Sequence, residues 1–97
     1  MARAIIDVII PAYNEELSIA KVIRDIPKDL VRNIIVCNNN SSDATAVVAS
    51  TAGAIVADEP SPGYGNACLR GMAYIEALPS DEKPDILVFM DGDYSDY

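Results

Sequence analysis

Short apolar runs alternate with amphipathic stretches along this chain of 97 residues, and the alternation restricts the fold more than any other feature. Four runs rich in β-branched or other apolar residues predict buried strands: Ala4–Ile10, Asn33–Cys37, Ala54–Ala57 and Ile86–Met90. Between them, apolar residues recur at helical spacing, from Leu17 to Ile26, from Ala44 to Ala52 and from Cys68 to Leu78. Strands that alternate with helices form parallel sheets, so the sequence predicts an α/β fold.

The topology of this sheet follows from the handedness of its connections. Right-handed crossovers predict the strand order 3-2-1-4, in a Rossmann-like parallel sheet with helices on both faces. The direction of winding reverses between the first and the fourth strand. Ligands of such sheets bind beyond the carboxyl ends of the strands at this reversal, and we expect a functional site there.

Local signals predict where the elements end. Pro11 is expected to end the first strand, and Asn14 to cap the first helix, with the two following glutamates in its first turn. Ser42 and Asp43 are expected to start the second helix in the same way. The predicted buried faces of the three helices comprise Ile19, Val22, Ile23 and Ile26; Ala44, Val47, Val48 and Ala52; and Cys68, Met72, Ile75 and Leu78.

The charge balance excludes one class of partner. Seven Lys and Arg residues stand against fifteen Asp and Glu residues, which gives a formal net charge of -8. A nucleic-acid partner would require a basic patch, so none is expected. A bound phosphate would require a cation or backbone amides to offset the repulsion.

Cysteine content and hydropathy favour a soluble protein from a reducing compartment, and we therefore expect a cytoplasmic location. Both cysteines lie in apolar patterns, which favours buried free thiols over a disulfide framework. No stretch has the form of a signal sequence, and no apolar run approaches the roughly 20 residues that a membrane span requires.

Polar clusters follow three of the predicted strands, and the predicted topology brings them to one edge of the sheet. Asp91 and Asp93 are two residues apart, so their carboxylates point the same way in extended backbone. Gly92 between them permits a close approach to a ligand. Hard oxygen ligands of this kind suit Mg²⁺ or Mn²⁺ on a diphosphate. The alternative is an ordinary Asp-Gly turn.

The other two clusters are Pro11–Glu15 and Asn38–Asn40. The ring of Tyr13 is suited to forming one wall of a nucleobase slot, or simply to packing. The asparagine amides carry both a donor and an acceptor and can read a base edge, although a turn with left-handed backbone explains the run as well. Before the third helix, Gly63–Asn66 has the composition of a phosphate-cradling loop, with Gly65 as the candidate contact, or of an ordinary glycine loop.

The acidic residues also restrict the chemistry of a ligand. Asp91, Asp93 and Glu15 would repel a nucleoside diphosphate at close range by a few kcal/mol, at an effective dielectric constant of about 20. A phosphate ligand is therefore compatible with this site only together with a divalent cation.

Three blocks of the sequence resemble the signature blocks of family 2 glycosyltransferases, which have the GT-A fold. The blocks are Val8–Glu16, Ile34–Thr45 and Val88–Asp93, and their order and spacing match those of the family. The stretch Glu59–Gly71 is most similar to the branch of dolichol-phosphate and other polyprenyl-phosphate sugar synthases. The resemblance covers the whole chain. It implies that residues 1–97 are the nucleotide-sugar-binding half-domain of such an enzyme, truncated after the Asp91-Gly92-Asp93 motif.

The resemblance implies a UDP- or GDP-sugar as the donor and a role for each matching position. The residues expected to line the donor are Pro11, Ala12, Tyr13, Asn14, Glu15, Asn38, Asn40, Gly65 and Gly92. Asp91 would contact the ribose or the metal, and Asp93 would hold Mg²⁺ or Mn²⁺ against the diphosphate, which makes these two the expected catalytic residues. The metal would act as a Lewis acid that stabilises the leaving group as the sugar moves to an acceptor such as a polyprenyl phosphate.

Two features depart from the family pattern. Asn38 stands where members usually have an aspartate that accepts a hydrogen bond from uracil, which leaves affinity and base preference open. In the family, the acceptor site and any catalytic base lie in a later half, so we expect this chain to bind nucleotide with little or no turnover. Its apolar run Ile86–Phe89 would then form an exposed sheet edge, which predicts self-association. For the full-length protein, the resemblance is compatible with peripheral attachment to a membrane.

Two interpretations from other functional classes compete with a transferase. One is a non-catalytic nucleotide-binding or scaffold domain. The other is a receiver-like signalling domain, which requires an acidic cluster directly after the first strand. This chain has Pro11 and Ala12 at that position, and only Asp58 and Glu59 after the third predicted strand suit the receiver pattern.

Overall fold

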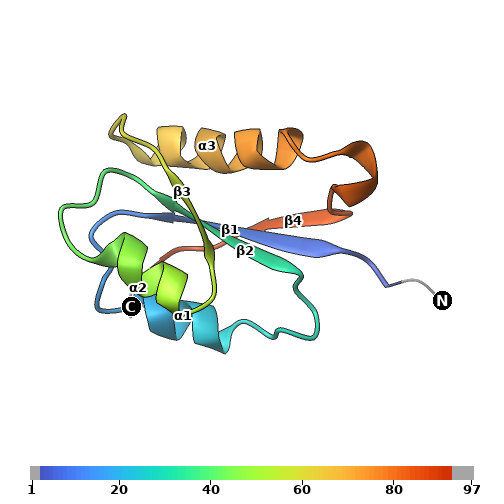
Figure 1. The fold of residues 1–97 in the computed structure, drawn as a ribbon, viewed down its shortest axis with the longest axis horizontal. Helices are drawn as coiled ribbons and strands as arrows, with labels where there is room; N and C mark the ends of the chain where they lie inside the picture. Colours follow the sequence, from blue (N-terminus) through green and yellow to red (C-terminus); the bar gives the residue numbers. More distant parts are fainter. Residues whose placement is uncertain (1–2, 93–97) are drawn as a thin grey trace.

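The computed structural model describes residues 3–92 and contains a four-stranded parallel sheet with helices on both faces (Figure 1). Its strands are β1 (Ile6–Ala12), β2 (Asn33–Asn38), β3 (Ile55–Asp58) and β4 (Ile86–Phe89). Its helices are α1 (Ile19–Asp25), α2 (Thr45–Thr51) and α3 (Tyr64–Glu76), and a short 3-10 helix, η1 (Ser80–Glu82), precedes β4. The strand order is β3-β2-β1-β4, which confirms the predicted α/β topology.

The core lies in two layers, one on each side of the sheet. In Figure 1, α3 covers one face, and α1 and α2 lie on the other. Successive residues of β1 point to opposite faces: Val8 and Ile10 pack in the cluster with α1, whereas Ile9 packs in the cluster with α3. Burial on both faces explains why the strands read as continuous apolar runs.

β1 continues through Pro11, so the prediction that this proline ends the strand is wrong. The register pairs Pro11 with Cys37 of β2, whereas pairing with β4 stops at Ile9. The carbonyl groups of odd-numbered β1 residues face β4, as the bond from the Met90 amide to the Ile9 carbonyl shows. Pro11 is therefore tolerated because its nitrogen points to the side where no strand remains to accept a bond.

The predicted helix caps are also wrong. α1 begins at Ile19 after Ser18, whose side chain makes no capping bond, and its first turn contains no acidic residue. Asn14 instead has a left-handed backbone with φ of 51° and bonds to a neighbouring loop. α2 begins at Thr45, and Asp43 lies before the helix, where its carboxylate accepts a bond from the Thr45 amide. Asn14 thus bonds to the neighbouring loop instead of capping α1, whereas Asp43 bonds locally to the first residue of α2.

The buried face was predicted correctly for α1 and only in part for the other helices. Ile19, Val22, Ile23 and Ile26 are all buried, as expected. In α2 the buried residues are Thr45 and Ala49, while Val47 is 69% exposed.

α3 buries Ala67, Gly71 and Ile75, so that Met72 faces outward and Cys68 is only half-buried. Small residues bring this helix close to the sheet. A Cβ at Gly71 would lie 2.6 Å from Ile9 Cγ2 and 3.0 Å from Cys37 Sγ.

An ion pair joins β1 to the residue before β2, near the amino ends of these strands. Asp7 is completely buried in β1, and its carboxylate accepts bonds from Arg32 Nη2 at 2.6 Å, from Arg32 Nε at 3.1 Å and from the Asn33 amide at 3.1 Å. The hydrogen bond to Asp7 raises the pKa of Arg32, although desolvation acts in the opposite direction. A buried charge is stable only when paired in this way.

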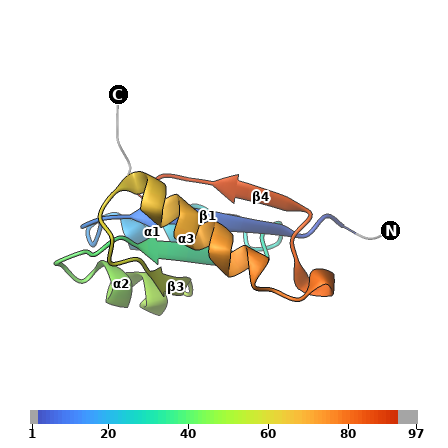
Figure 2. The ribbon, with the colours of Figure 1, turned by 90° about the horizontal axis from the view of Figure 1, so that it is seen from above.

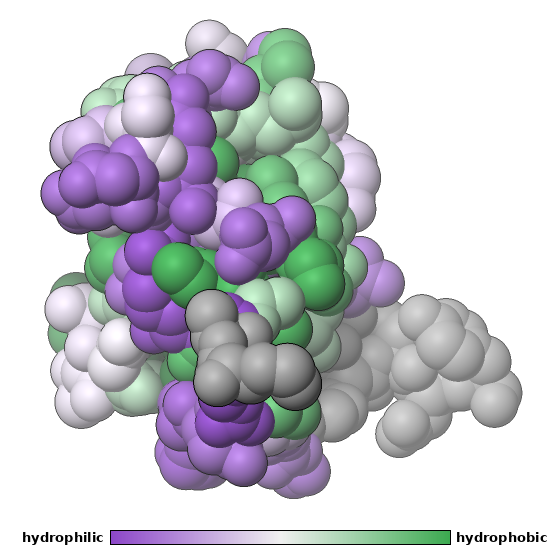
Figure 3. All heavy atoms as spheres, turned by 90° about the vertical axis from the view of Figure 1, so that its right-hand side faces the viewer, coloured by the Kyte–Doolittle hydropathy of each residue, from purple (hydrophilic) through white to green (hydrophobic). Residues whose placement is uncertain are grey.

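β4 forms an apolar edge of the sheet. Figure 2 shows it at the opposite edge from β3, and Ile86, Val88 and Phe89 are all exposed. Figure 3 shows hydrophobic surface gathered on the side of the molecule where β4 lies. The helices within residues 3–92 are too short or too polar for any of them to cross a bilayer.

Candidate functional site

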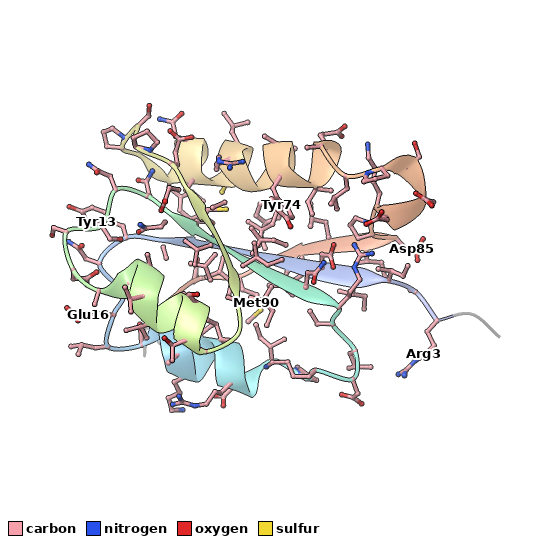
Figure 4. The ribbon with its side chains drawn as sticks, viewed as in Figure 1. Arg3, Tyr13, Glu16, Tyr74, Asp85 and Met90 are labelled. Carbon is pink, nitrogen blue, oxygen red and sulfur yellow. The ribbon has the colours of Figure 1, made fainter. Side chains whose placement is uncertain are left out.

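A cavity of about 610 Å³ opens beyond the carboxyl ends of the strands. Its walls come from the segments that follow β1, β2 and β4 and from the start of α3. The lining residues are Pro11, Ala12, Tyr13, Glu15, Asn39, Asn40, Pro62, Gly63, Tyr64, Ala67, Asp91 and Gly92. In Figure 4, Tyr13 lies at this end of the sheet, and Arg3 and Asp85 lie at the other. The cavity is therefore at the reversal of winding between β1 and β4, where such sheets bind ligands.

Most of the predicted donor-site residues lie in this one cavity. Those that line it are Pro11, Ala12, Tyr13, Glu15, Asn40, Asp91 and Gly92, and those that do not are Asn14, Asn38 and Gly65. Asp93, the second carboxylate of the predicted metal site, lies outside the described residues. Three segments that are far apart in the sequence thus meet at one site, as the strand order predicts.

The asparagines at the end of β2 bond to different partners. Asn38 turns toward β3, where its Nδ2 donates to Asp58 Oδ1 at 3.0 Å, and its buried Oδ1 has no hydrogen-bond partner among the described residues. Asn39 lines the cavity, but its amide holds the loop before α3: Oδ1 accepts from the Gly63 amide at 2.9 Å, and Nδ2 donates to the Ser61 carbonyl at 2.8 Å. The amide of Asn39 therefore shapes one wall of the cavity.

The start of α3 supplies a wall that the sequence did not reveal in full. Tyr64 is the first residue of the helix, and its ring lines the cavity together with Pro62 and Ala67. The nearby Cys68 thiol, partial burial and the Asp91 charge all raise the pKa of Tyr64, so its hydroxyl remains protonated at neutral pH. Gly63, with φ of 122°, makes the turn into the helix. Gly65 lies within the helix between the lining residues Tyr64 and Ala67 but does not itself line the cavity.

Asp91 and Gly92 reach the cavity from β4. The backbone of Gly92 packs against the end of β1, where an added Cβ would lie 3.3 Å from the Pro11 carbonyl oxygen. The Gly92 carbonyl accepts a bond from the Ser18 hydroxyl at 2.9 Å. A glycine is favoured at this position because the loop passes so close to β1.

The loop after β1 is bonded to the loop after β2. The Asn14 amide donates to Ser41 Oγ at 3.0 Å, the Glu15 amide to Thr45 Oγ1 at 2.8 Å, and the Ser42 amide to Asn14 Oδ1 at 2.9 Å. Asn14 and Asn40 both have left-handed backbones, with φ of 51° and 58°. These bonds fix the segment that carries Tyr13 and Glu15 into the cavity.

The electrostatics of the cavity fit a metal-bound anion. Glu15 and Asp91 both line it, and none of the described lining residues is basic. Residues 3–92 contain no group of three or more His, Cys, Asp or Glu side chains that could hold a metal ion without further ligands. Mg²⁺ and Mn²⁺ are commonly held by one or two carboxylates plus phosphate oxygens, so the carboxylate of Asp91 is suited to be one of several ligands.

Comparison with known sequences identifies related proteins. The model of the family described as "Glycosyl transferase family 2" matches residues 7–96. Protein RfbJ of Shigella flexneri is 45% identical over 89 residues, which cover 91% of this chain and 64% of that protein. The 4,4'-diaponeurosporenoate glycosyltransferase of Staphylococcus haemolyticus is 35% identical over 96 residues, which cover 91% of this chain and 24% of that protein.

Solved structures match the fold with comparable coverage. The glucosyl-3-phosphoglycerate synthase of Mycobacterium tuberculosis, in complex with Mn²⁺, UDP and glucosyl-3-phosphoglycerate, is 33% identical with a TM-score of 0.75. The match covers 92% of this chain and 33% of that one, and the same values hold for its complex with Mg²⁺ and UDP. The present chain thus spans less than two thirds of the length of each of these relatives.

Proposed function

This chain belongs to glycosyl transferase family 2, and from that premise we propose that its cavity binds the nucleotide part of a nucleotide-sugar donor. One observation carries the proposal: the ends of β1 and β4 bring Tyr13, Glu15 and Asp91 into the same cavity. In the full-length protein, the donor sugar would be transferred from the nucleoside diphosphate to an acceptor.

The described geometry supports an assignment of roles within the cavity. The exposed rings of Tyr13 and Tyr64 lie on segments from different elements, and each ring offers a flat apolar surface for a nucleobase. The amino-terminal end of α3 reaches the cavity at Gly63, and the partial positive charge of a helix start favours the diphosphate. Pro11 and Ala12 form the floor between these groups.

A divalent cation, Mg²⁺ or Mn²⁺, is part of the proposal. The acidic lining would repel a free diphosphate, and the carboxylate of Asp91 is a hard oxygen ligand at the right position. Asp93, two residues further on, is proposed as the second carboxylate. When bound, such a cation stabilises the negative charge that develops on the leaving nucleoside diphosphate. The chain's own carboxylates hold and orient it.

We further propose that the donor is a UDP- or GDP-sugar and that the acceptor in the full-length protein is a lipid phosphate of the polyprenyl type. The similarity of Glu59–Gly71 to polyprenyl-phosphate sugar synthases supports that acceptor class. The relatives are named for chemically different compounds: one is a 4,4'-diaponeurosporenoate glycosyltransferase, and another is a synthase of glucosyl-3-phosphoglycerate. This range supports an acceptor site built by residues other than the shared ones.

Calorimetric titration with UDP, UDP-glucose and GDP-mannose, each with and without Mn²⁺, tests the donor site. We expect binding of at least one nucleotide that strengthens at least tenfold when Mn²⁺ is present. Asp93→Ala should abolish the metal dependence. Asp81→Ala, which changes an exposed acidic residue of η1 at the far end of the sheet, is the matched control and should titrate like the parent chain.

The outcomes separate the competing functions. A folded sample that binds none of the three nucleotides would exclude the donor site. Metal-dependent binding without sugar transfer in the full-length protein would favour the non-catalytic nucleotide-binding alternative. Binding that is unchanged by Asp93→Ala would show that the nucleotide binds without the proposed metal.

A further inference from the structure

Three consecutive backbone amides in the loop after β1 donate to three side-chain oxygens that follow β2. The Asn14 amide donates to Ser41 Oγ at 3.0 Å, the Glu15 amide to Thr45 Oγ1 at 2.8 Å, and the Glu16 amide to Asp43 Oδ2 at 3.3 Å. No regular secondary structure connects the two loops at these positions. The conformation of the first loop therefore depends on two side chains of the loop before α2 and on the first side chain of that helix, Thr45.

Thr45 is the central member of this set. Its side chain is completely buried, and its hydroxyl accepts from the Glu15 amide while donating to Asp43 Oδ1. The same carboxylate oxygen accepts from the Thr45 amide at 2.9 Å. Because the hydroxyl proton is directed to Asp43, its lone pairs are directed to Glu15. The group therefore has a defined orientation in addition to a defined position.

The carboxylate of Asp43 is held in its charged form by the same bonds. Desolvation raises the pKa of Asp43, but hydrogen bonds from the Thr45 hydroxyl, the Thr45 amide and the Glu16 amide outweigh it and keep that pKa below its usual value. Charge-assisted bonds to a carboxylate are stronger than bonds between neutral groups. Asp43 thus anchors Thr45, and Thr45 anchors Glu15.

We propose that Thr45 is a positioning residue for the donor nucleotide, which acts by holding the Glu15 backbone so that the side chains of Tyr13 and Glu15 stay in the cavity. The inference rests on the proposed donor-binding function. Thr45 itself does not line the cavity, so it acts only through the loop. Neither the metal-binding pattern nor the strand-end clusters of the sequence pointed to it.

A pair of substitutions separates the hydroxyl from the shape of the side chain. Thr45→Val keeps the buried volume and removes both hydrogen bonds of the hydroxyl, whereas Thr45→Ser keeps the hydroxyl and leaves a small void. We expect Thr45→Val to weaken UDP binding in the presence of Mn²⁺ about tenfold, and Thr45→Ser to bind within about twofold of the parent chain. Thermal unfolding measured alongside establishes that each variant is folded at the temperature of the titration.

Hydrogen exchange of the Glu15 amide gives a second readout that needs no ligand. We expect slow exchange in the parent chain and in Thr45→Ser, and faster exchange in Thr45→Val. If the parent chain binds no nucleotide, the donor-site proposal fails, and unchanged Glu15 exchange in Thr45→Val would separately overturn the positioning role. Thr51→Val, at the exposed end of α2, is the matched control.

The expected pattern is a loss of affinity that follows the hydroxyl and not the stability. Equal UDP affinity in Thr45→Val and the parent chain would overturn the proposal. So would parallel losses of affinity in the valine and serine variants, because packing alone would then explain them. If the valine variant does not fold, Asp43→Asn tests the same link: it should weaken UDP binding, and parent-like affinity would count against the proposal.

Discussion

The Ser18 hydroxyl donates a hydrogen bond of 2.9 Å to the carbonyl oxygen of Gly92, 74 residues further along the chain. This bond ties the residue before α1 to the loop that follows β4. Asp91, the described carboxylate of the proposed metal site, belongs to that loop. The position of Asp91 in the cavity is therefore set partly by a side chain that precedes α1.

Removing this bond should weaken metal-dependent nucleotide binding. We expect Ser18→Ala to reduce the affinity for UDP with Mn²⁺ by about two- to tenfold, which corresponds to the usual value of about 0.5–1.5 kcal/mol for one hydrogen bond. Calorimetry measures the effect, and Ser50→Ala at an exposed position of α2 serves as the control. An affinity equal to that of the parent chain would mean that the loop keeps its position without Ser18.

The approach of α3 to the sheet predicts opposite effects for two glycine substitutions in one helix. Gly71→Ala would place a Cβ 2.6 Å from Ile9 Cγ2 and should destabilise the fold by about 1–3 kcal/mol. Gly65→Ala meets no atom within 4 Å and should stabilise the helix by about 0.5–1 kcal/mol. Urea unfolding of both variants provides the test, and equal stabilities would show that α3 shifts freely on the sheet.

The two partners of the buried ion pair should differ in their importance. Arg32→Met leaves the fully buried Asp7 charge without its partner, and we expect a loss of about 3–5 kcal/mol in the free energy of unfolding. Asp7→Asn keeps an acceptor for the Asn33 amide and leaves Arg32, which is 33% exposed, able to reach water. A smaller loss of about 1–3 kcal/mol is expected. The reverse ranking in chemical denaturation would contradict this account.

The exposed edge strand predicts self-association of the chain. Val88 and Phe89 present apolar side chains beside the unpaired edge of β4, and such an edge can pair with a second copy. Light scattering at high concentration should give a mass above that of a monomer, and Phe89→Lys should lower it. Val47→Lys replaces an apolar residue that is 69% exposed on α2, which packs over β2 and β3 at the other side of the sheet, and should leave the mass unchanged. A monomeric parent chain would exclude edge pairing.

Burial predicts that the two cysteine thiols differ in their reactivity. Burial raises the pKa of Cys37 to about 11, although Arg70 lowers it to a smaller extent, so this thiol stays protonated at neutral pH. Iodoacetamide at pH 8 should therefore modify half-buried Cys68 and spare Cys37 in the folded chain. Above pH 11 the Cys37 thiol should lose its proton, but iodoacetamide should still reach it only where the fold has opened. Mass spectrometry of the digested protein would reveal equal labelling if the packing of α3 were loose.

The strand order could be predicted from the sequence because four apolar runs alternate with helical patterns and only one handedness of crossover is common. The contact face of α3 could not, because Ala67 and Gly71 contribute little hydrophobicity while permitting close packing. The helix starts were predicted wrongly for a related reason. Asn14 and Asp43 look like helix caps in the sequence. In the structure, Asn14 Oδ1 accepts from the Ser42 amide, and the Asp43 carboxylate accepts from the amides of Glu16 and Thr45.

The candidate site could be predicted where its residues directly follow strands. Glu15 and Asp91 line the cavity because the strand order brings the ends of β1 and β4 together. Tyr64 and Asn39 belong to two predicted clusters, but they were not singled out within them. Their positions depend on the path of the loop before α3, which Asn39 itself holds through the Gly63 amide. Such a path is set by bonds between distant segments, and no spacing within the sequence reports them.

The two ends of β1 have different roles in the molecule. Asp7 at its start is locked with Arg32, whereas Pro11 and Ala12 at its finish border the cavity. Because the ion pair and the cavity lie at opposite ends of one rigid strand, substitutions around the pair can change how tightly the scaffold folds while the ligand preference stays constant. Protein engineering or natural selection can therefore change the free energy of unfolding and the choice of ligand independently of each other.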